Sequence, residues 1–211
     1  MALSYTTLTG AKTVDESIAN WVNNATVPAA TVLTEAQAAL YTSLRVRDML
    51  ARQEDTIAKD ATTLALPARY LEAVAFHLTG NDAAVVKQRP KEEVEGDITW
   101  DGAARVAGTP TKFYTDATDF VFDHRADKAY GYRVLYFQEL APLAATTNET
   151  NFLTDRYPRL LRMACLAAAN EFLRDDEEKA YWLALLQAEI EKANGQFDTE
   201  QRGVEVLVEA G

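Results

Sequence analysis

The sequence has few of the residues that most often carry chemistry: one cysteine and two histidines in 211 residues. A disulfide framework needs a second cysteine, and a cysteine-based metal site needs several ligands at short spacing, so neither fits this chain. The one cysteine, Cys165, lies among alanines on an expected helix, where a thiol acts as a small buried apolar group. The cysteine content therefore favours a reducing compartment such as the cytosol.

Long apolar runs are also missing from the sequence. No stretch approaches the roughly 20 consecutive apolar residues that a membrane-spanning helix needs. Residues 1–17 lack the basic start and the long apolar core of a secretion signal. We therefore expect neither export nor a membrane partner.

Positive charge is scarce, because 21 lysines and arginines face 32 aspartates and glutamates, a formal net charge of −11. Proteins that bind nucleic acids generally carry a basic patch that neutralises phosphates, so the balance argues against that class. Two interpretations stay open. The chain is an acidic protein whose copies repel one another, or it forms a wall that DNA passes without sticking.

What is present indicates a globular protein, with 48% hydrophobic and 25% charged residues in a length sufficient for one core. A first helical region is expected at residues 11–52. Thr13 and Thr34 are each followed three residues later by a Glu or Gln, which is the spacing of a capping box. We expect a helix to start at each threonine, the second of them running to about Ala51.

A second helical region is expected at residues 150–195. Asp155 caps its first helix, and Pro158 lies in the first turn, where no intrahelical hydrogen bond is lost. The acidic residues 175–178 open the last helix, because negative charge suits the positive end of the helix dipole, and Gly195 ends or frays it. The expected buried faces comprise Leu160, Leu161, Ala164, Ala168 and Phe172, followed by Leu183, Leu186, Ile190 and Ala193.

Between these regions, residues 57–138 are expected to be rich in strand. Residues 111–116 and 118–123 predict a hairpin, and residues 129–138 predict a third strand, because β-branched and aromatic residues dominate there. Arg133 should point away from the buried face of the third strand. That face carries Tyr130, Tyr132, Val134 and Tyr136.

The last residues, 203–211, show a strand pattern, because Val204, Val206 and Val208 alternate with glutamates. Such a segment either folds back onto its own sheet or adds to the sheet edge of another subunit. We expect these three valines together with Leu207 to contact a partner.

Two groups of residues could in principle carry chemistry. His124 lies beside Asp123 and Asp127, which could complete a metal site or orient a base, but short polar residues between two strands are expected as turn formers. His77 lies in an apolar run and is expected in the core. On the short acidic helix expected at residues 91–96, which Pro90 opens, the carboxylates form a solvated face. They are Glu92, Glu93 and Glu95.

A phosphate-binding glycine loop and a nucleophile elbow are both absent from the sequence. We therefore predict no catalytic, metal-binding or cofactor-binding residue, no cofactor and no enzymatic activity. The elements together predict an α+β fold that is mainly α. It is a single domain, residues 1–211, in which a helical bundle receives a hairpin and third strand between Gly108 and Gln138 and ends in a strand-like arm.

Four motifs carry a resemblance to a known family. They are LPARYL at 66–71, GTPTKFY at 108–114, YGYRVLYF at 130–137, and the stretch at 148–182 that begins NETNFLTDRYPRLL. In this order they resemble the head-to-tail adaptor, or connector, proteins of tailed bacteriophages. The chain departs from the pattern at 122–127, FDHRAD, where a turn with proline is expected.

The resemblance implies a subunit of a ring, usually dodecameric, in the virion neck after assembly in the host cytoplasm. Its implied partners are the portal protein ring, other copies of the chain, a tail or nozzle/stopper protein, and double-stranded DNA that passes without specific binding. The alternatives are another neck or tail-completion protein of the stopper type, or a non-viral helical protein-binding module. The sequence lacks the combination of nucleophile, base and pocket that a small hydrolase or a nucleotide enzyme would need.

A ring subunit must bury a large surface against its neighbours. We expect the helix at 156–173, or the helix after Lys179, to supply part of that surface. The competing interpretation is that both helices serve only as the core of the subunit.

Overall fold

A computed structural model describes the backbone of residues 3–101 and 104–208 and the side chains of residues 3–99 and 105–196. The chain divides into two compact units, a helical unit of residues 1–48 and 140–211 and a strand unit of residues 49–139. The fold belongs to the α+β class, as expected. That helix predominates and that the whole chain acts as one domain stay predictions.

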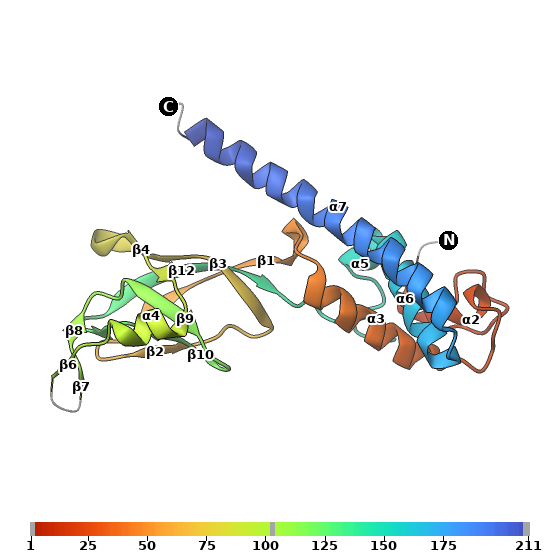
Figure 1. The fold of residues 1–211 in the computed structure, drawn as a ribbon, viewed down its shortest axis with the longest axis horizontal. Coiled ribbons are helices and arrows are strands. Elements are labelled where there is room, and N and C mark those ends of the chain that lie inside the picture. Colours follow the sequence, from red (N-terminus) through yellow and green to blue (C-terminus); the bar gives the residue numbers. More distant parts are fainter. Residues whose placement is uncertain (1–2, 102–103, 209–211) are drawn as a thin grey trace. The chain divides into compact units, whose positions relative to one another are not determined.

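The helical unit is built on α3 (Ala29–Ser43), α6 (Pro158–Leu173) and α7 (Asp176–Val208). In Figure 1, α6 lies beside both α3 and α7. Leucines on α3 and α6 and Ile190 on α7 are buried between them. Three single-turn helices complete the described part of this unit, namely α1 (Tyr5–Leu8), α2 (Ile18–Trp21) and α5 (Phe152–Asp155).

The helix starts near the N-terminus differ from the prediction. The helix expected from Thr13 is the single turn α2, and Ser17 caps it by accepting a hydrogen bond from the Asn20 amide. Helix α3 begins at Ala29, directly after Pro28 and five residues before Thr34, whose hydroxyl donates to a backbone carbonyl inside the helix. The helix also ends at Ser43 and not at 51, because the chain from Leu50 onward pairs as a strand.

The ends of the later helices were also mispredicted. Asp155 closes α5, and Pro158 is the first residue of a separate helix, α6, where its missing amide proton is not needed. Gly195 lies within α7, which continues to Val208. The expectation of a strand is therefore wrong for residues 203–208, where helical backbone hydrogen bonds override the alternating pattern. Residues 209–211 lie outside the described part of the chain.

The strand unit contains two four-stranded sheets. The first has the order β1-β12-β3-β4 and the second β2-β10-β9-β5. The expected hairpin is confirmed as β9 and β10, and the expected third strand as β12, which lies in the other sheet between β1 and β3. The first sheet comprises β1 (Leu50–Ile57), β12 (Tyr130–Gln138), β3 (Tyr70–Leu78) and β4 (Ala84–Val85). The second comprises β2 (Thr63–Ala65), β10 (Asp119–Phe122), β9 (Lys112–Thr115) and β5 (Lys87–Gln88).

Smaller elements complete the described part of the strand unit. The expected acidic helix is confirmed as α4, and Pro90 precedes it. Two short strand pairs lie outside the main sheets. These elements are the 3-10 helices η1 (Arg47–Met49), which spans the boundary between the units, and η2 (Gly80–Asp82), the helix α4 (Lys91–Gly96), and the strands β6 (Trp100–Asp101), β7 (Ala104–Arg105), β8 (Ala107–Gly108) and β11 (Arg125–Ala126).

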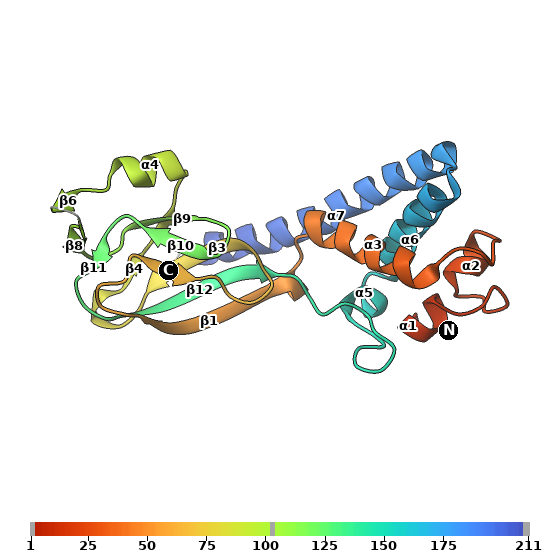
Figure 2. The same ribbon diagram turned by 90° about the horizontal axis from the view of Figure 1, so that it is seen from below.

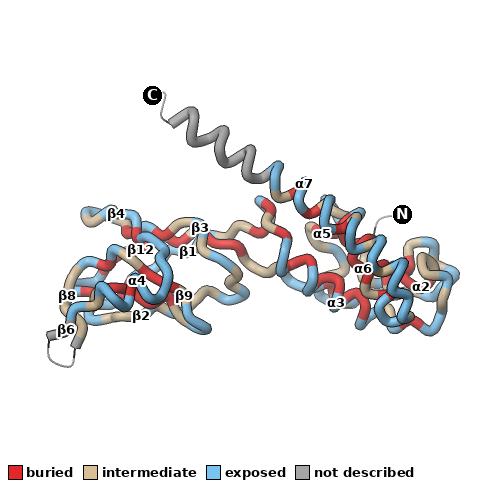
Figure 3. Tube along the Cα trace, viewed as in Figure 1, coloured by how far each residue is buried: buried red, intermediate tan, exposed pale blue. Residues whose placement is uncertain are grey.

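An aromatic core joins the two sheets. The Phe76 ring on β3 stacks on Tyr132, with 5.3 Å between the ring centroids, and contacts Phe113, Phe120 and Phe122 from the second sheet. The predicted faces of β12 are confirmed, since its four expected inner residues are buried and Arg133 is exposed. Figure 2 shows β1 and β12 side by side, and Figure 3 shows the buried segments within each unit.

Candidate assembly surface

Helix α6 is narrow, because alanines and Cys165 occupy much of its surface. Small side chains allow neighbouring helices to approach closely. Cys165 is fully buried, as expected, and this burial raises the pKa of its thiol. A thiol that stays protonated is a poor nucleophile, so Cys165 is a packing residue. The alanines of the helix are Ala164, Ala167, Ala168 and Ala169.

A groove of about 410 Å³ lies between α3, α6 and α7. Its apolar lining comes from alanines of α3 and α6 and from leucines of α7. Charged groups stand at its border, where the Lys179 ammonium lies 3.1 Å from a carboxylate oxygen of Glu171. The lining residues are Glu35, Ala36, Ala39, Ala164, Ala167, Ala168, Glu171, Phe172, Lys179, Leu183 and Leu186.

Large apolar side chains are exposed beside this groove. Phe172 is 51% exposed and Leu183 45%, and both line the groove, whereas Tyr181, which is 56% exposed, is not part of its lining. The expectation that Phe172 and Leu183 are buried is therefore wrong, and Ala168 is only half-buried, whereas the other residues of the two expected faces are buried. The helical spacing places these side chains correctly on the inward stripe, but the described helices do not cover the last turn of α6. Contiguous exposed apolar groups on a soluble domain often mark an interaction surface.

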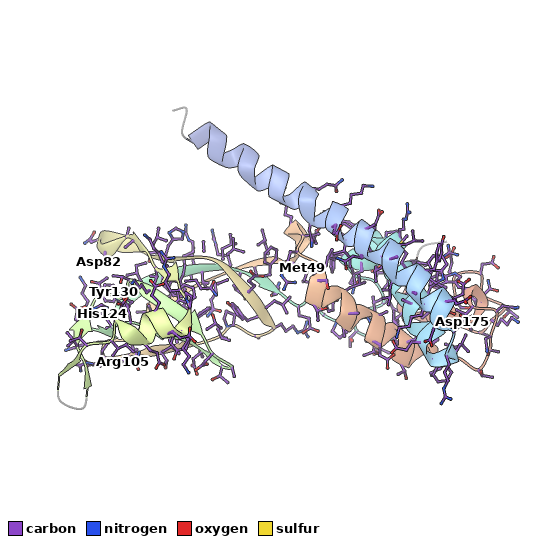
Figure 4. The ribbon with its side chains drawn as sticks, viewed as in Figure 1. Met49, Asp82, Arg105, His124, Tyr130 and Asp175 are labelled. Atoms are coloured by element: carbon purple, nitrogen blue, oxygen red, sulfur yellow. The ribbon has the colours of Figure 1, made fainter. Side chains whose placement is uncertain are left out.

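An acidic corner joins α6 to α7. Arg174 ends α6 in the left-handed conformation, with φ of 58°, and the Asp175 amide donates to the Asn170 carbonyl at 3.0 Å. The Asp175 side chain accepts a hydrogen bond from the Glu178 amide at 3.1 Å, so the expected acidic opening of the last helix is confirmed. Figure 4 labels Asp175 at this corner. We define the acidic corner as Glu171, Phe172 and residues 175–178.

A basic cleft lies at the other end of α6, in two adjoining cavities of about 310 and 170 Å³. Tyr157, Leu160 and Ala193 contribute to the lining. We define the basic cleft by its four cations, Arg47, Arg156, Arg159 and Lys192. Sequence reasoning missed this cleft, because its members are up to 145 positions apart and no local motif connects them.

The cations of the cleft differ in their partners. Arg156 lies 2.6 Å from the Asp48 carboxylate, and Lys192 lies 3.9 Å from Glu189. Arg47 and Arg159 are exposed and have no ion pair among the described side chains. The cleft therefore presents two guanidinium groups that can bind further carboxylates or phosphates.

Comparison with known proteins identifies the family of this chain. Residues 9–207 match the family described as SU10 adaptor protein. The chain belongs to this family. The family is of the phage head–tail adaptor type, so the chain is a phage structural adaptor that interacts with other head or tail proteins. No curated protein matches the chain significantly.

The histidines of this adaptor were only partly predicted. His77 is exposed on β3, so its expected place in the core is wrong; its neighbours Phe76 and Leu78 take the buried positions of the strand. His124 follows β10 in a turn, as expected, and its Nδ1 lies 3.1 Å from a buried Asp123 oxygen without the alignment of a hydrogen bond. No group of three or more metal-binding side chains occurs in the described residues.

Asp123 has a structural role in the adaptor. Burial alone would raise the pKa of its carboxyl, but hydrogen bonds from the Thr111 side chain and amide outweigh burial and lower that pKa. The carboxylate also accepts a bond from the His124 amide at 3.0 Å. Asp123 therefore ties the end of β10 to the segment that leads into β9.

The carboxylates of α4 lie on an exposed face, as expected, and two of them connect the helix to β9. Glu93 lies 3.2 Å from the Lys112 ammonium. Glu95 accepts a 2.7 Å hydrogen bond from the Tyr114 hydroxyl. Burial and this contact raise the pKa of Tyr114 to about 12. Among the described helices, none is both long and apolar enough to cross a bilayer.

Proposed function

We propose that the chain is a ring-forming head–tail adaptor that docks on the portal ring, extends the DNA channel and joins the tail or a nozzle or stopper protein. The observation that carries this proposal is the family match over residues 9–207, which includes parts of both units. The exposed apolar residues beside the groove support it, because a ring subunit needs apolar surface for its neighbours. The family also suggests a structural and not an enzymatic role.

The proposed location is the virion neck, with the host cytoplasm as the place of assembly. A net charge of −11 suits a channel protein, because carboxylates repel phosphates and let duplex DNA slide. Lysine-rich walls would instead hold the DNA. The proposed dodecameric ring follows from the family resemblance alone.

We assign the contact with the portal or with a neighbouring copy to Val204, Val206, Leu207 and Val208. The 33 residues of α7 extend over about 50 Å, whereas the 16 residues of α6 extend over about 24 Å. The last turns of α7 therefore lie beyond the length over which α6 can pack against them. This extra length supports a contact outside the subunit.

The deciding experiment measures mass by light scattering, for the purified chain with and without an isolated cognate portal ring. We expect the chain to co-migrate with the portal ring in multiple copies, even if it is a monomer alone. If the chain co-migrates with the portal ring at none of the salt concentrations tested, the portal-docking role is overturned. A stopper-type protein would bind only after another neck protein has been added, and a non-viral binding module would bind neither.

Deleting residues 203–211 tests the C-terminal contact. We expect a melting temperature close to that of the full chain and at least tenfold weaker binding to the portal ring, because only external contacts are lost. A chain in which the same nine positions carry glycine and serine controls for length. Loss of the fold on deletion would show that the segment belongs to the core of the subunit.

A further inference from the structure

We infer that the basic cleft of one copy receives the acidic corner of the next copy, so that subunits join head to tail. This inference rests on the proposed ring and names the surfaces that form it. Both surfaces belong to the helical unit and lie at opposite ends of α6, about 24 Å apart. A contact between two different surfaces of identical subunits is heterologous, and repetition of such a contact closes a ring when the rotation allows.

Charge selects the partner of the cleft. The cleft carries four cations against the carboxylates of Asp48 and Glu189. The corner carries five carboxylates, at Glu171 and 175–178, against Arg174 and Lys179. Two clefts or two corners would repel each other, whereas a cleft and a corner attract.

Unpaired charges are available on both surfaces. In the cleft, Arg47 and Arg159 have no ion pair among the described side chains. At the corner, the exposed Asp176 and Glu177 have none there either, while Glu171 is held by Lys179. Guanidinium groups bind carboxylates through two parallel hydrogen bonds, so docking can pair the two arginines with these two acids.

Shape agrees with charge at this contact. Phe172 stands on the corner with half of its side chain in solvent. The larger cavity of the cleft, about 310 Å³, is lined by Tyr157, Pro158 and Leu160 between the cations. An aromatic side chain in such a cavity gives a contact with an apolar centre and a charged rim, which is the usual anatomy of a specific interface.

Charge reversal of each surface tests the inference. The cleft variant combines Arg47→Glu with Arg159→Glu, and the corner variant combines Asp176→Lys with Glu177→Lys. Copies bound per portal ring are counted by light scattering, and circular dichroism checks that each variant is folded. We expect each variant alone to assemble at least tenfold more weakly than the wild-type chain, since like charges then meet at every contact.

Recombining the two variants gives the sharper result. An equal mixture of them restores assembly, because reversed cleft meets reversed corner and native cleft meets native corner in alternation. One chain that carries all four changes also assembles, within about threefold of the wild type. Lys59→Glu with Lys87→Glu, two exposed cations of the strand unit, and Glu92→Lys with Asp55→Lys, two exposed acids there, are matched controls that leave assembly unchanged.

The outcomes separate the inference from the function beneath it. If the wild-type chain assembles on the portal and either reversed variant assembles equally well, the contact between cleft and corner is wrong and the adaptor role stands. Failure of both the mixture and the four-fold variant to recover, with the variants folded, also overturns the contact. If the wild-type chain does not bind the portal at all, the proposed function fails first.

Discussion

The strand unit and the helical unit place their large apolar side chains differently. In the strand unit the rings of Phe76, Phe113, Phe120 and Phe122 are fully buried, and its exposed large aliphatic residues, within the described part, are Val74 on β3 and Val85 on the edge strand β4. In the helical unit leucines and alanines are buried between the helices, and Phe172 is half exposed. The aromatic residues of the strand unit therefore stabilise the fold of that unit. The helical unit leaves Phe172 and Tyr181 about half exposed, and Phe172 is available for a partner.

Charged groups follow the same division. In the strand unit, acids and bases are matched locally, as where Lys112 contacts both Glu93 and Asp97. In the helical unit, charges of opposite sign collect at the two ends of α6. Surface ion pairs contribute little to stability, so a separation of this kind matters mainly for recognition.

The largest expected loss of stability follows from removing the central ring of the strand unit. Phe76→Ala should lower the free energy of unfolding of this unit by about 3–5 kcal/mol, because it leaves a cavity among four rings. Hydrogen exchange of the β12 amides measures the loss. Val85→Ala, at a 56% exposed position in the same sheet, should change it by less than about 0.5 kcal/mol. Equal effects would mean that the aromatic core does not hold the sheets together.

Much of the strand unit was predictable because alternation is a local signal. The faces of β12 and the hairpin of β9 and β10 follow from residues two apart. Strand β1 was missed, since its segment LARQEDTI carries three charged residues and continues a helical pattern. It becomes a strand because β12 offers eight backbone pairings, a tertiary effect that no window of sequence reveals.

In the helical unit the existence of the main helices was predictable, but their ends and surfaces were not. A proline fits the first position of a helix as readily as a later position of the first turn. The sequence therefore could not decide that Pro158 is the first residue of α6. The exposure of Phe172 depends on where the neighbouring helices stop. The basic cleft joins Arg47 to Arg159 and Lys192, and only the fold brings these residues together.

The next effect concerns the buried carboxylate of the strand unit. Asp123→Asn should destabilise this unit by about 1–3 kcal/mol at pH 7, because the charged hydrogen bonds from Thr111 are weakened. Since the folded pKa of Asp123 is lowered, its contribution is complete above its unfolded pKa of about 4 and is lost as the pH falls through the lower folded value.

The test compares the urea midpoints of the wild-type chain and Asp123→Asn from pH 7 down to pH 2. The difference between them should shrink only below about pH 4. Other carboxylates titrate equally in both proteins, so they cancel in the difference. Asp55→Asn, at an exposed position on β1, is the matched control. A difference that is constant across the pH range would show that the charge of Asp123 contributes nothing.

A similar effect is expected in the helical unit, at the one cysteine. Cys165→Ser should cost about 1–3 kcal/mol, because a hydroxyl replaces a thiol at a fully buried position among apolar groups. The wild-type thiol should react with a thiol reagent only as fast as the unit unfolds, since burial keeps it protonated. The rate of thiol labelling, measured in buffer and in urea, checks this: labelling should be blocked in buffer and rapid in urea. Fast labelling of the native protein would place Cys165 at the surface.

The smallest effect on stability is expected at the exposed phenylalanine of the helical unit. Phe172→Ser should change the free energy of unfolding by no more than about 0.5 kcal/mol, because half of the ring is already in water. The same change should weaken the association of copies on a portal ring at least tenfold if Phe172 fills the neighbouring cleft. Phe172→Tyr, which keeps the ring, is the matched control and should retain most of the association. A large loss of stability with unchanged association would reverse the comparison, making the helical unit as self-contained as the strand unit.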